Sequence, residues 1–133
     1  MAVVVVNGQK FGSKTEYEYY CKLFGLLQLG KIKSLEREVR FNLKNIPLND
    51  DLTYNPKARD LFYKCDFKVV DNYDRVHYIE YKGWLRRHSR IKMAYCETAY
   101  GINIRVVPDR AGYRDDFSFL FDKNLPRCRY NLE

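Results

Sequence analysis

Histidine is scarce in this sequence, which contains only two among its 133 residues, His77 and His88. The four cysteines are scattered, and they show neither the Cys-x-x-Cys pair nor the nearby histidine that is typical of a zinc site. These shortages argue against a zinc site and against a nucleophilic site that depends on histidine. We expect the cysteines to be reduced and structural, and any chemistry to rest on carboxylates and lysine.

Long apolar runs are absent as well. The apolar run at the start of the chain, Met1 to Val6, is far shorter than the roughly 20 residues that cross a bilayer. It also lacks the basic region that begins a signal peptide. We therefore expect a soluble, intracellular protein without a membrane span.

The chain does contain enough apolar material for a core, because 46% of its residues are hydrophobic and 16% are aromatic. Its length of 133 residues is close to the common size of one domain, so we expect residues 1–133 to form a single domain. The formal net charge of +7 favours anionic partners, with nucleic acid before a membrane surface.

The most informative stretch is residues 65–83, CDFKVVDNYDRVHYIEYKG. Two strand-favouring runs, Phe67 to Val70 and Val76 to Tyr81, flank a polar segment of turn formers, which predicts an antiparallel hairpin. A turn centred on Tyr73 places Asp66 opposite Glu80 on the neighbouring strand.

Two carboxylates that face each other across a hairpin destabilise the sheet unless something lies between them. Mg²⁺ would serve well, because it takes hard oxygen ligands and often uses one or two carboxylates. Lys82 shares a face with Glu80, where an ammonium could orient or activate a metal-bound water. The alternative is a solvated hairpin face, since Asp66, Glu80 and Lys82 at this spacing also occur by chance.

A helix is predicted from Ser13 to Gly30. Ser13 and Glu16 have the spacing of a capping box, and Gly30 is a typical helix end. The apolar residues at helical spacing are Tyr20, Leu23, Phe24 and Leu27. Glu16 therefore has two interpretations, as a partner of the Ser13 cap or as an acidic residue of the site.

The remaining segments complete a mixed α and β pattern. Leu35 to Leu43 alternates in polarity and predicts a strand with one buried face, and Leu61 to Tyr63 extends the first strand of the hairpin. Val3 to Val6 is either an edge strand or a dimer arm. The other predicted segments are a connection at 31–34, a loop at 44–57 that is a candidate for substrate contact, a strand at 102–107 beside the hairpin, a short helix at 115–121 and a basic tail at 127–129.

Basic residues follow Lys82 directly. The segment from Trp84 to Lys92 enters a predicted helix that ends at Gly101, with Ile91, Ala94, Tyr95 and Thr98 on one face. Runs of charge are usually solvated surface. The position of this run beside the proposed metal site favours phosphate binding instead.

The order helix, strand, hairpin, helix, strand is that of the αβββαβ core of PD-(D/E)XK nucleases, and the chain resembles this superfamily from about Ser13 to Val107. Within the superfamily it resembles small phage nucleases, including the phage endonuclease I type of Holliday-junction resolvase. The similar segments are Ser13-Lys14-Thr15-Glu16, Gly30-Lys31-Ile32, the strand from Glu36 to Leu43, Asp66-Phe67 and Glu80-Tyr81-Lys82-Gly83. Cys65 departs from the pattern, because proline usually precedes the aspartate.

The resemblance implies an α/β (α+β) fold with a restriction-endonuclease-like mixed central sheet between helices. The core would span about 13–107, with an N-terminal strand or arm at 1–12 and a C-terminal extension at 108–133. The implied activity is Mg²⁺-dependent hydrolysis of DNA phosphodiester bonds by an endonuclease, with Mn²⁺ able to substitute. For a junction resolvase the partner would be branched DNA and the active form a homodimer, in the host cytoplasm if a phage encodes it.

The resemblance also assigns roles to residues. Asp66 and Glu80 would bind the metal, together with the Tyr81 carbonyl and Glu16, directly or through water, and Lys82 would position or activate the attacking water. The implied DNA-binding residues are Lys14, Trp84, Arg86, Arg87, Arg90 and Lys92.

Two other functions remain open at this stage. The chain could be a restriction, repair or packaging nuclease that cuts linear duplex, or a DNA-binding protein of the same fold without catalysis. A comparison of substrates separates the first from a resolvase, and a cleavage assay separates the second.

Overall fold

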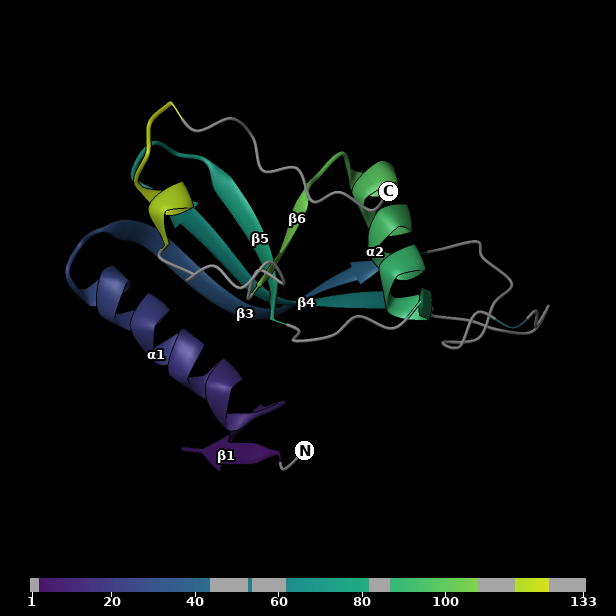
Figure 1. Cartoon of the computed structure of the whole chain (residues 1–133), viewed down its shortest axis with the longest axis horizontal. Helices are drawn as coiled ribbons and strands as arrows, with labels where there is room; N and C mark the ends of the chain where they lie inside the picture. Colours follow the sequence, from purple (N-terminus) through teal and green to yellow (C-terminus); the bar gives the residue numbers. More distant parts are fainter. Residues whose placement is uncertain (1–2, 44–52, 54–61, 82–86, 108–116, 125–133) are drawn as a thin grey trace.

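The computed structural model of the chain describes residues 3–43, 53, 62–81, 87–107 and 117–124. Its elements in chain order are β1 (Val4–Val6), β2 (Gln9–Phe11), α1 (Lys14–Gln28), β3 (Ile32–Asn42), β4 (Phe62–Asp71), β5 (Val76–Tyr81), α2 (Arg87–Tyr100), β6 (Ile104–Val107) and the 3-10 turn η1 (Ser118–Leu120). From α1 to β6 this is the predicted order of helix, strand, hairpin, helix and strand (Figure 1).

The central sheet has four strands in the order β3-β4-β5-β6. The β3–β4 and β4–β5 pairs are antiparallel, whereas β5 and β6 are parallel and α2 forms the connection between them. A mixed sheet with two long helices confirms the predicted α+β class. None of the helices in the described ranges is long and apolar enough to cross a bilayer.

The register of the central hairpin is the one predicted from a turn centred on Tyr73. Cross-strand partners run from Val70–Val76 at the turn to Phe67–Ile79. The register was predictable because the turn formers from Asp71 to Arg75 leave only a short connection between the two strands.

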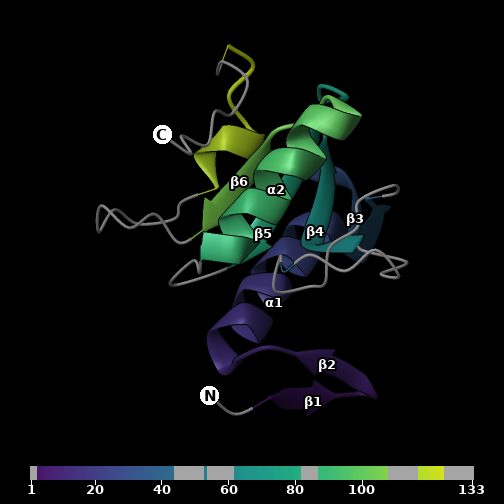
Figure 2. The ribbon, with the colours of Figure 1, turned by 90° about the vertical axis from the view of Figure 1, so that its right-hand side faces the viewer.

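Two apolar clusters lie on the two faces of β5. Tyr78 packs against the cluster beside α2, and its neighbour Ile79 belongs to the cluster beside α1. The α2-side cluster is formed by Phe41, Leu43, Tyr63, Cys65, Met93, Cys96, Ile104 and Val106. The α1-side cluster is formed by Tyr19, Leu23, Ile32, Phe67, Val69, Ile79, Val107, Phe119 and Leu120. Figure 2 shows α2 on the near side of the sheet, with α1 beyond it.

The buried faces of the helices differ from the predicted ones. On α2 the buried residues are Met93 and Cys96, while Ile91 and Tyr95 are 46% and 45% exposed. On α1 Tyr19 is buried beside Leu23, whereas Phe24 is exposed; Tyr20 and Leu27 are partly buried. Each helix carries more than one apolar stripe. The sheet decides which stripe is buried, and spacing along the sequence does not.

Several boundaries also differ. β3 begins at Ile32, so most of the predicted connection at 31–34 belongs to the strand. Gly30 has a φ of 72°, and the amide of Lys31 donates to the carbonyl of Leu26, which closes the helix and starts the strand at once. β6 starts at Ile104, and the predicted helix at 115–121 is the shorter η1. Apart from residue 53, the predicted loop at 44–57 lies outside the described residues, as does the basic tail at 127–129.

The N-terminal strand pairs with a second strand that the sequence analysis did not predict. β1 and β2 form a separate two-stranded antiparallel sheet below α1 (Figure 2). Asn7 and Gly8 connect them with φ values of 49° and 78°, which are typical of a tight hairpin turn with two left-handed residues. Within this chain, β1 is thus an edge of a hairpin and not an added strand of the central sheet.

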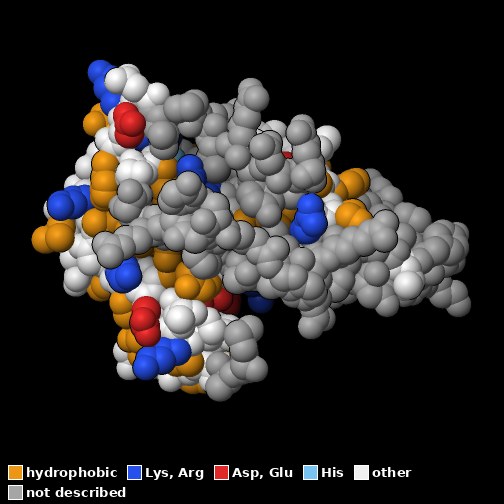
Figure 3. Space-filling model, viewed as in Figure 1, with side chains coloured by type: hydrophobic (Ala, Val, Ile, Leu, Met, Phe, Trp, Pro, Cys, Tyr) orange, Lys and Arg blue, Asp and Glu red, His pale blue; other side chains and the backbone are white. Residues whose placement is uncertain are grey.

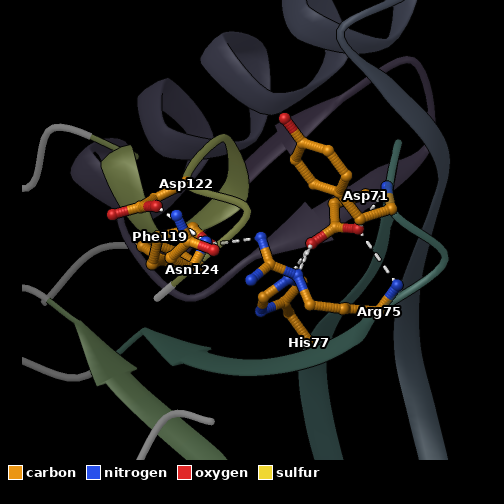
Figure 4. Close-up of polar contacts among 7 residues, drawn as sticks. Asp71, Arg75, His77, Phe119, Asp122 and Asn124 are labelled. Atoms are coloured by element: carbon orange, nitrogen blue, oxygen red, sulfur yellow. Dashed lines mark hydrogen bonds and ion pairs between the residues drawn. The ribbon is translucent and has the colours of Figure 1, made fainter. Parts of the chain in front are cut away.

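Asp71 holds the β4–β5 turn together (Figure 4). Its buried carboxylate accepts hydrogen bonds from the amides of Tyr73 and Arg75 at 2.8 and 3.0 Å. Its other oxygen lies 2.6 Å from Arg75 Nε and 2.7 Å from His77 Nε2. Arg75 Nη2 also donates to the carbonyl of Phe119 at 3.4 Å, so the same cluster ties η1 to the hairpin.

The pKa values of Asp71 and His77 are both lower than usual. Burial raises the pKa of the Asp71 carboxyl, but the hydrogen bonds from His77, Arg75 and Tyr73 outweigh it and the pKa lies below its usual value. Burial lowers the pKa of His77, and this effect outweighs the attraction of Asp71. Neutral His77 with a proton on Nε2, the tautomer assigned from this network, therefore donates to Asp71.

Both groups bind protons less readily in the folded than in the unfolded chain. The free energy of unfolding should therefore fall on acidification, through His77 below about pH 6.5 and through Asp71 below about pH 3.9. At pH 7, Asp71→Asn should lower it by on the order of 2 kcal/mol or more, because Arg75 and His77 lose their acceptor. Urea unfolding of wild type and variant across this pH range measures both effects.

The matched control is Asp74→Asn, in the same turn. Its exposed carboxylate pairs with Lys33, and the change should cost under about 1 kcal/mol. An Asp71→Asn variant as stable as this control would contradict the stabilising role of the network.

Candidate functional site

Asp66 and Glu80 occupy the first positions beyond the end of the β4–β5 pairing. The paired residues stop at Phe67–Ile79. One position beyond, the carboxylate of Asp66 accepts the hydrogen bond of the Tyr81 amide, with 2.8 Å between Oδ2 and N. A side chain of β4 thus takes the place of a main-chain partner for β5, and it fixes the Asp66 carboxylate beside the end of that strand.

Glu80 is a buried acid, with only 3% of its surface exposed. Its Oε1 accepts a hydrogen bond from the Tyr63 hydroxyl at 2.7 Å. Burial and, next, the negative charge of Glu80 raise the pKa of the Tyr63 hydroxyl well above its usual value, so Tyr63 stays protonated and donates. A buried carboxylate needs such a donor, because an unpaired charge in the interior is costly.

The charges of both Asp66 and Glu80 affect the pKa of the Cys65 thiol. Its pKa is raised by burial first, then by the charge of Glu80 and, to a smaller extent, by the charge of Asp66. Both carboxylates also act on the Tyr63 hydroxyl. The carboxylates of Asp66 and Glu80 therefore both lie near Tyr63 and Cys65. Cys65 is a neutral structural thiol, which donates to the carbonyl of Ile79 at 3.4 Å and is no candidate nucleophile.

The β3–β4 pair changes its orientation at Asp66. On β4, Tyr63 and Cys65 belong to the α2-side cluster, while Phe67 and Val69 belong to the α1-side cluster. Side chains two residues apart on a regular strand point to one face, so the strand turns over between Cys65 and Phe67.

Glu38 faces Asp66 across this turn, between the pairs Arg37–Phe67 and Val39–Cys65. It has a φ of 53°, a left-handed conformation that non-glycine residues seldom adopt. The irregular backbone lets β3 follow the bend of β4. Asp66 thus sits at an irregular point of the β3–β4 pair, which has another irregularity between Ile32 and Ser34.

Glu16 lies in the first turn of α1. The Ser13 hydroxyl accepts from the Glu16 amide at 3.1 Å, which confirms the predicted N-cap. The Glu16 carboxylate reaches back to the Gly12 amide, with 3.4 Å between N and Oε2, one residue before the cap expected for a capping box. This contact supports the interpretation of Glu16 as a residue that stabilises the start of α1.

The two carboxylates suit a hard divalent cation. A carboxylate oxygen that accepts one hydrogen bond keeps a lone pair, so the bonds to Asp66 and Glu80 are compatible with coordination. In the described ranges no group of three or more His, Cys, Asp or Glu side chains is placed to hold a metal. Mg²⁺ commonly uses only one or two carboxylates and keeps several waters, which fits this pair.

Four of the six predicted DNA-binding residues, Lys14, Arg87, Arg90 and Lys92, lie within the described ranges. Lys14 is exposed in the first turn of α1, Arg90 is exposed on α2, and the Lys92 ammonium lies 5.9 Å from the centre of the Phe62 ring. Arg87 is the first residue of α2. Trp84 and Arg86 fall outside the described residues, as does Lys82, which was predicted to be catalytic.

Sequence reasoning missed the contributions of Tyr63 and Glu38. Tyr63 carried a signal only as an extension of the first hairpin strand, and the predicted register pairs it with no residue of β5. Glu38 occupies one of the polar positions in an alternating strand. Both depend on the bend of β3 and β4, which has no local signature in the sequence.

A protein-family model described as "Protein of unknown function (DUF1064)" matches residues 2–107. The match covers most of the chain, and the chain belongs to this family. It spans α1 through β6 and therefore includes Asp66, Glu80 and the strands that carry them. No curated protein and no solved structure matches the chain.

Tyr63→Phe tests the hydrogen bond to Glu80 at nearly constant volume. Hydrogen bonds to charged groups contribute about 1.5–3 kcal/mol, so the free energy of unfolding at pH 7 should fall by about this amount. Urea unfolding measures the change. Tyr73→Phe removes a hydroxyl from a residue that is 47% exposed and serves as the control. Equal stability of the two variants would show that the Tyr63 hydroxyl is dispensable for Glu80.

Proposed function

We propose that this protein is a Mg²⁺-dependent endonuclease that hydrolyses phosphodiester bonds in DNA. The observation that carries the proposal is that the Tyr81 amide and the Tyr63 hydroxyl hold the carboxylates of Asp66 and Glu80 at the end of the β4–β5 pairing. The element order from α1 to β6 and the net charge of +7 also support it.

Each residue of the candidate site would have its own role in metal binding or hydrolysis. Asp66 and Glu80 would hold Mg²⁺, with the Tyr81 carbonyl and, through water, Glu16 as further ligands. The bound cation would polarise the phosphate and lower the pKa of a bound water. Lys82, next to Tyr81 in the chain, would orient that water and offset charge that develops on the phosphate. Mn²⁺ also accepts oxygen ligands and should substitute.

The proposed substrate is branched DNA, such as a four-way junction. A resolvase cuts two strands at symmetric positions, and this chain has one Asp66, Glu80 and Lys82 set, so the active form would be a homodimer. The outer edge of β1 is a candidate for the contact between copies, because Val5 in β1 and Val3 just before it are exposed and β1 pairs only on its β2 side within the described residues.

Asp66→Asn and Glu80→Gln should each abolish Mg²⁺-dependent cleavage while DNA binding is largely retained. Each change keeps the size and polarity of the side chain and removes the charge that holds the cation. Cleavage of labelled DNA with Mg²⁺ and with excess EDTA provides the measurement. Glu18→Gln, which removes a charge from the exposed surface of α1, is the matched control and should cut like wild type.

The same assay decides among the substrates. Wild type is incubated with linear duplex, nicked, single-stranded, flapped and four-way DNA, and sedimentation gives its mass. Faster cutting of the junction by a dimer supports the resolvase. A monomer that cuts linear duplex equally fast would leave only the general nuclease. Binding to the substrates without cleavage of any of them would contradict the proposed endonuclease activity and favour a non-catalytic DNA-binding protein.

Glu16→Gln separates chemistry from capping. The amide oxygen of glutamine can still accept from Gly12, so the free energy of unfolding should change little. Loss of the charge should lower the cleavage rate by about tenfold or more, as is common for groups that act on a metal through water. Cleavage kinetics and urea unfolding of one preparation give both values. An unchanged rate would leave Glu16 with its local role alone.

A further inference from the structure

An open hollow of about 650 Å³ lies between the β1–β2 hairpin and the middle of β3. Its wall includes Gln9 and Lys10 from β2, Arg37 and Glu38 from β3, and Lys64 from β4. A volume of this size is within the range of about 300–1,000 Å³ that is usual for ligand sites. The proposed nuclease chemistry uses none of these five residues.

The charge of the hollow is positive. Three of the residues named are cations and one is an anion, Glu38, whose Oε1 lies 3.8 Å from Arg37 Nη2. Within the part of the chain that the structure describes, neither Lys10 nor Lys64 forms an ion pair. In Figure 3 basic side chains are spread over the described surface of one face, with acidic ones beside some of them.

Lys64 faces a second cation across the strands. It is paired with Arg40 on β3, and both residues are exposed. Like charges that are directly opposed destabilise a sheet, so an anion that binds beside Lys64 relieves a repulsion built into the β3–β4 pair. The guanidinium of Arg40 lies 3.9 Å from the Phe62 ring centre and so leans along the strand.

Arg37 gives the hollow a fixed shape. Its Nη2 donates to the carbonyl of Lys10 at 2.6 Å, and its Nη1 donates to Gln9 Oε1 at 3.4 Å. Its guanidinium also lies 3.8 Å from the centre of the Phe11 ring. These contacts join the hairpin to β3 and so fix the distance between the two walls of the hollow.

The hollow lies next to Asp66, one of the two acids of the candidate metal site. Lys64 is two positions before Asp66 on β4, about 7 Å along a strand, and Glu38 faces Asp66 across the β3–β4 pair. Each DNA strand carries one phosphate per roughly 3.4 Å of helix axis, so nearby phosphates of one strand could reach both places.

We propose that this hollow binds backbone phosphates of the DNA strand that passes the Asp66 and Glu80 carboxylates, through Lys10 and Lys64, with Arg37 as the residue that positions the walls. The inference rests on the proposed function and adds a second binding surface on the side of the molecule away from α2. It assigns the β1–β2 hairpin to substrate contact.

The test is a comparison of two double variants with equal loss of charge. Lys10→Gln with Lys64→Gln removes both cations of the hollow. Lys22→Gln with Lys123→Gln removes two exposed cations elsewhere; Lys22 lies about 200° round α1 from the hollow residue Tyr20. Binding of a short labelled duplex is measured in EDTA, so that no cleavage occurs, at several salt concentrations. Circular dichroism checks that each variant is folded.

The hollow variant should bind at least about tenfold more weakly than the control variant. The slope of log K against log salt should become shallower by about 0.9 for each phosphate that the hollow variant no longer neutralises. Glu38→Gln should act in the opposite direction and tighten binding, because it removes the one anion named in the wall. Equal affinities and equal slopes for the two double variants would overturn the assignment.

The outcomes also separate this inference from the proposed nuclease. Wild type that binds and cuts DNA, with a hollow variant that binds like the control, overturns only the hollow. Wild type whose binding depends on the hollow but that never cuts DNA overturns only the nuclease. Wild type that binds no DNA overturns both.

Discussion

Burial of the Glu80 carboxylate is the constraint on which the centre of this structure depends. Removing a charge from water costs several kcal/mol unless polar partners replace the water. Tyr63 provides one such partner, and it reaches Glu80 because β3 and β4 turn over near Asp66. The same bend brings the Asp66 carboxylate to the amide of Tyr81. The positions of Glu80 and Asp66 thus both depend on the bend in the β3–β4 pair.

Local signals predicted the hairpin well. The turn formers from Asp71 to Arg75 determined the register, and the register placed Asp66 one step beyond the last paired residue, Phe67. Helix α1 was equally predictable, because Ser13 caps it and Gly30 ends it. These features depend on residues that are neighbours in the sequence, where the side-chain chemistry and the backbone preference agree.

Other features depend on contacts between distant segments, and the sequence did not predict them. Met93 and Cys96 are buried on α2 in place of Ile91 and Tyr95, because the sheet selects one of two apolar stripes. Tyr63 meets Glu80 only after β4 bends, and the left-handed Glu38 has no marker in an alternating strand. The sequence thus identified the acids of the candidate site but not the groups that hold them.

The N-terminal hairpin has a consequence for how stability is distributed. A two-stranded hairpin is marginal by itself in water, and of β1 and β2 only Phe11 is buried. The hydrogen bonds of Arg37 hold it to β3, and because it buries so little surface we expect it to open before the four-stranded sheet unfolds. Any ligand held between the hairpin and β3 binds only the attached form, and by mass action it protects the amides of β1 and β2 from exchange with solvent. Occupancy of the hollow and attachment of the β1–β2 hairpin to β3 are then two measures of one equilibrium.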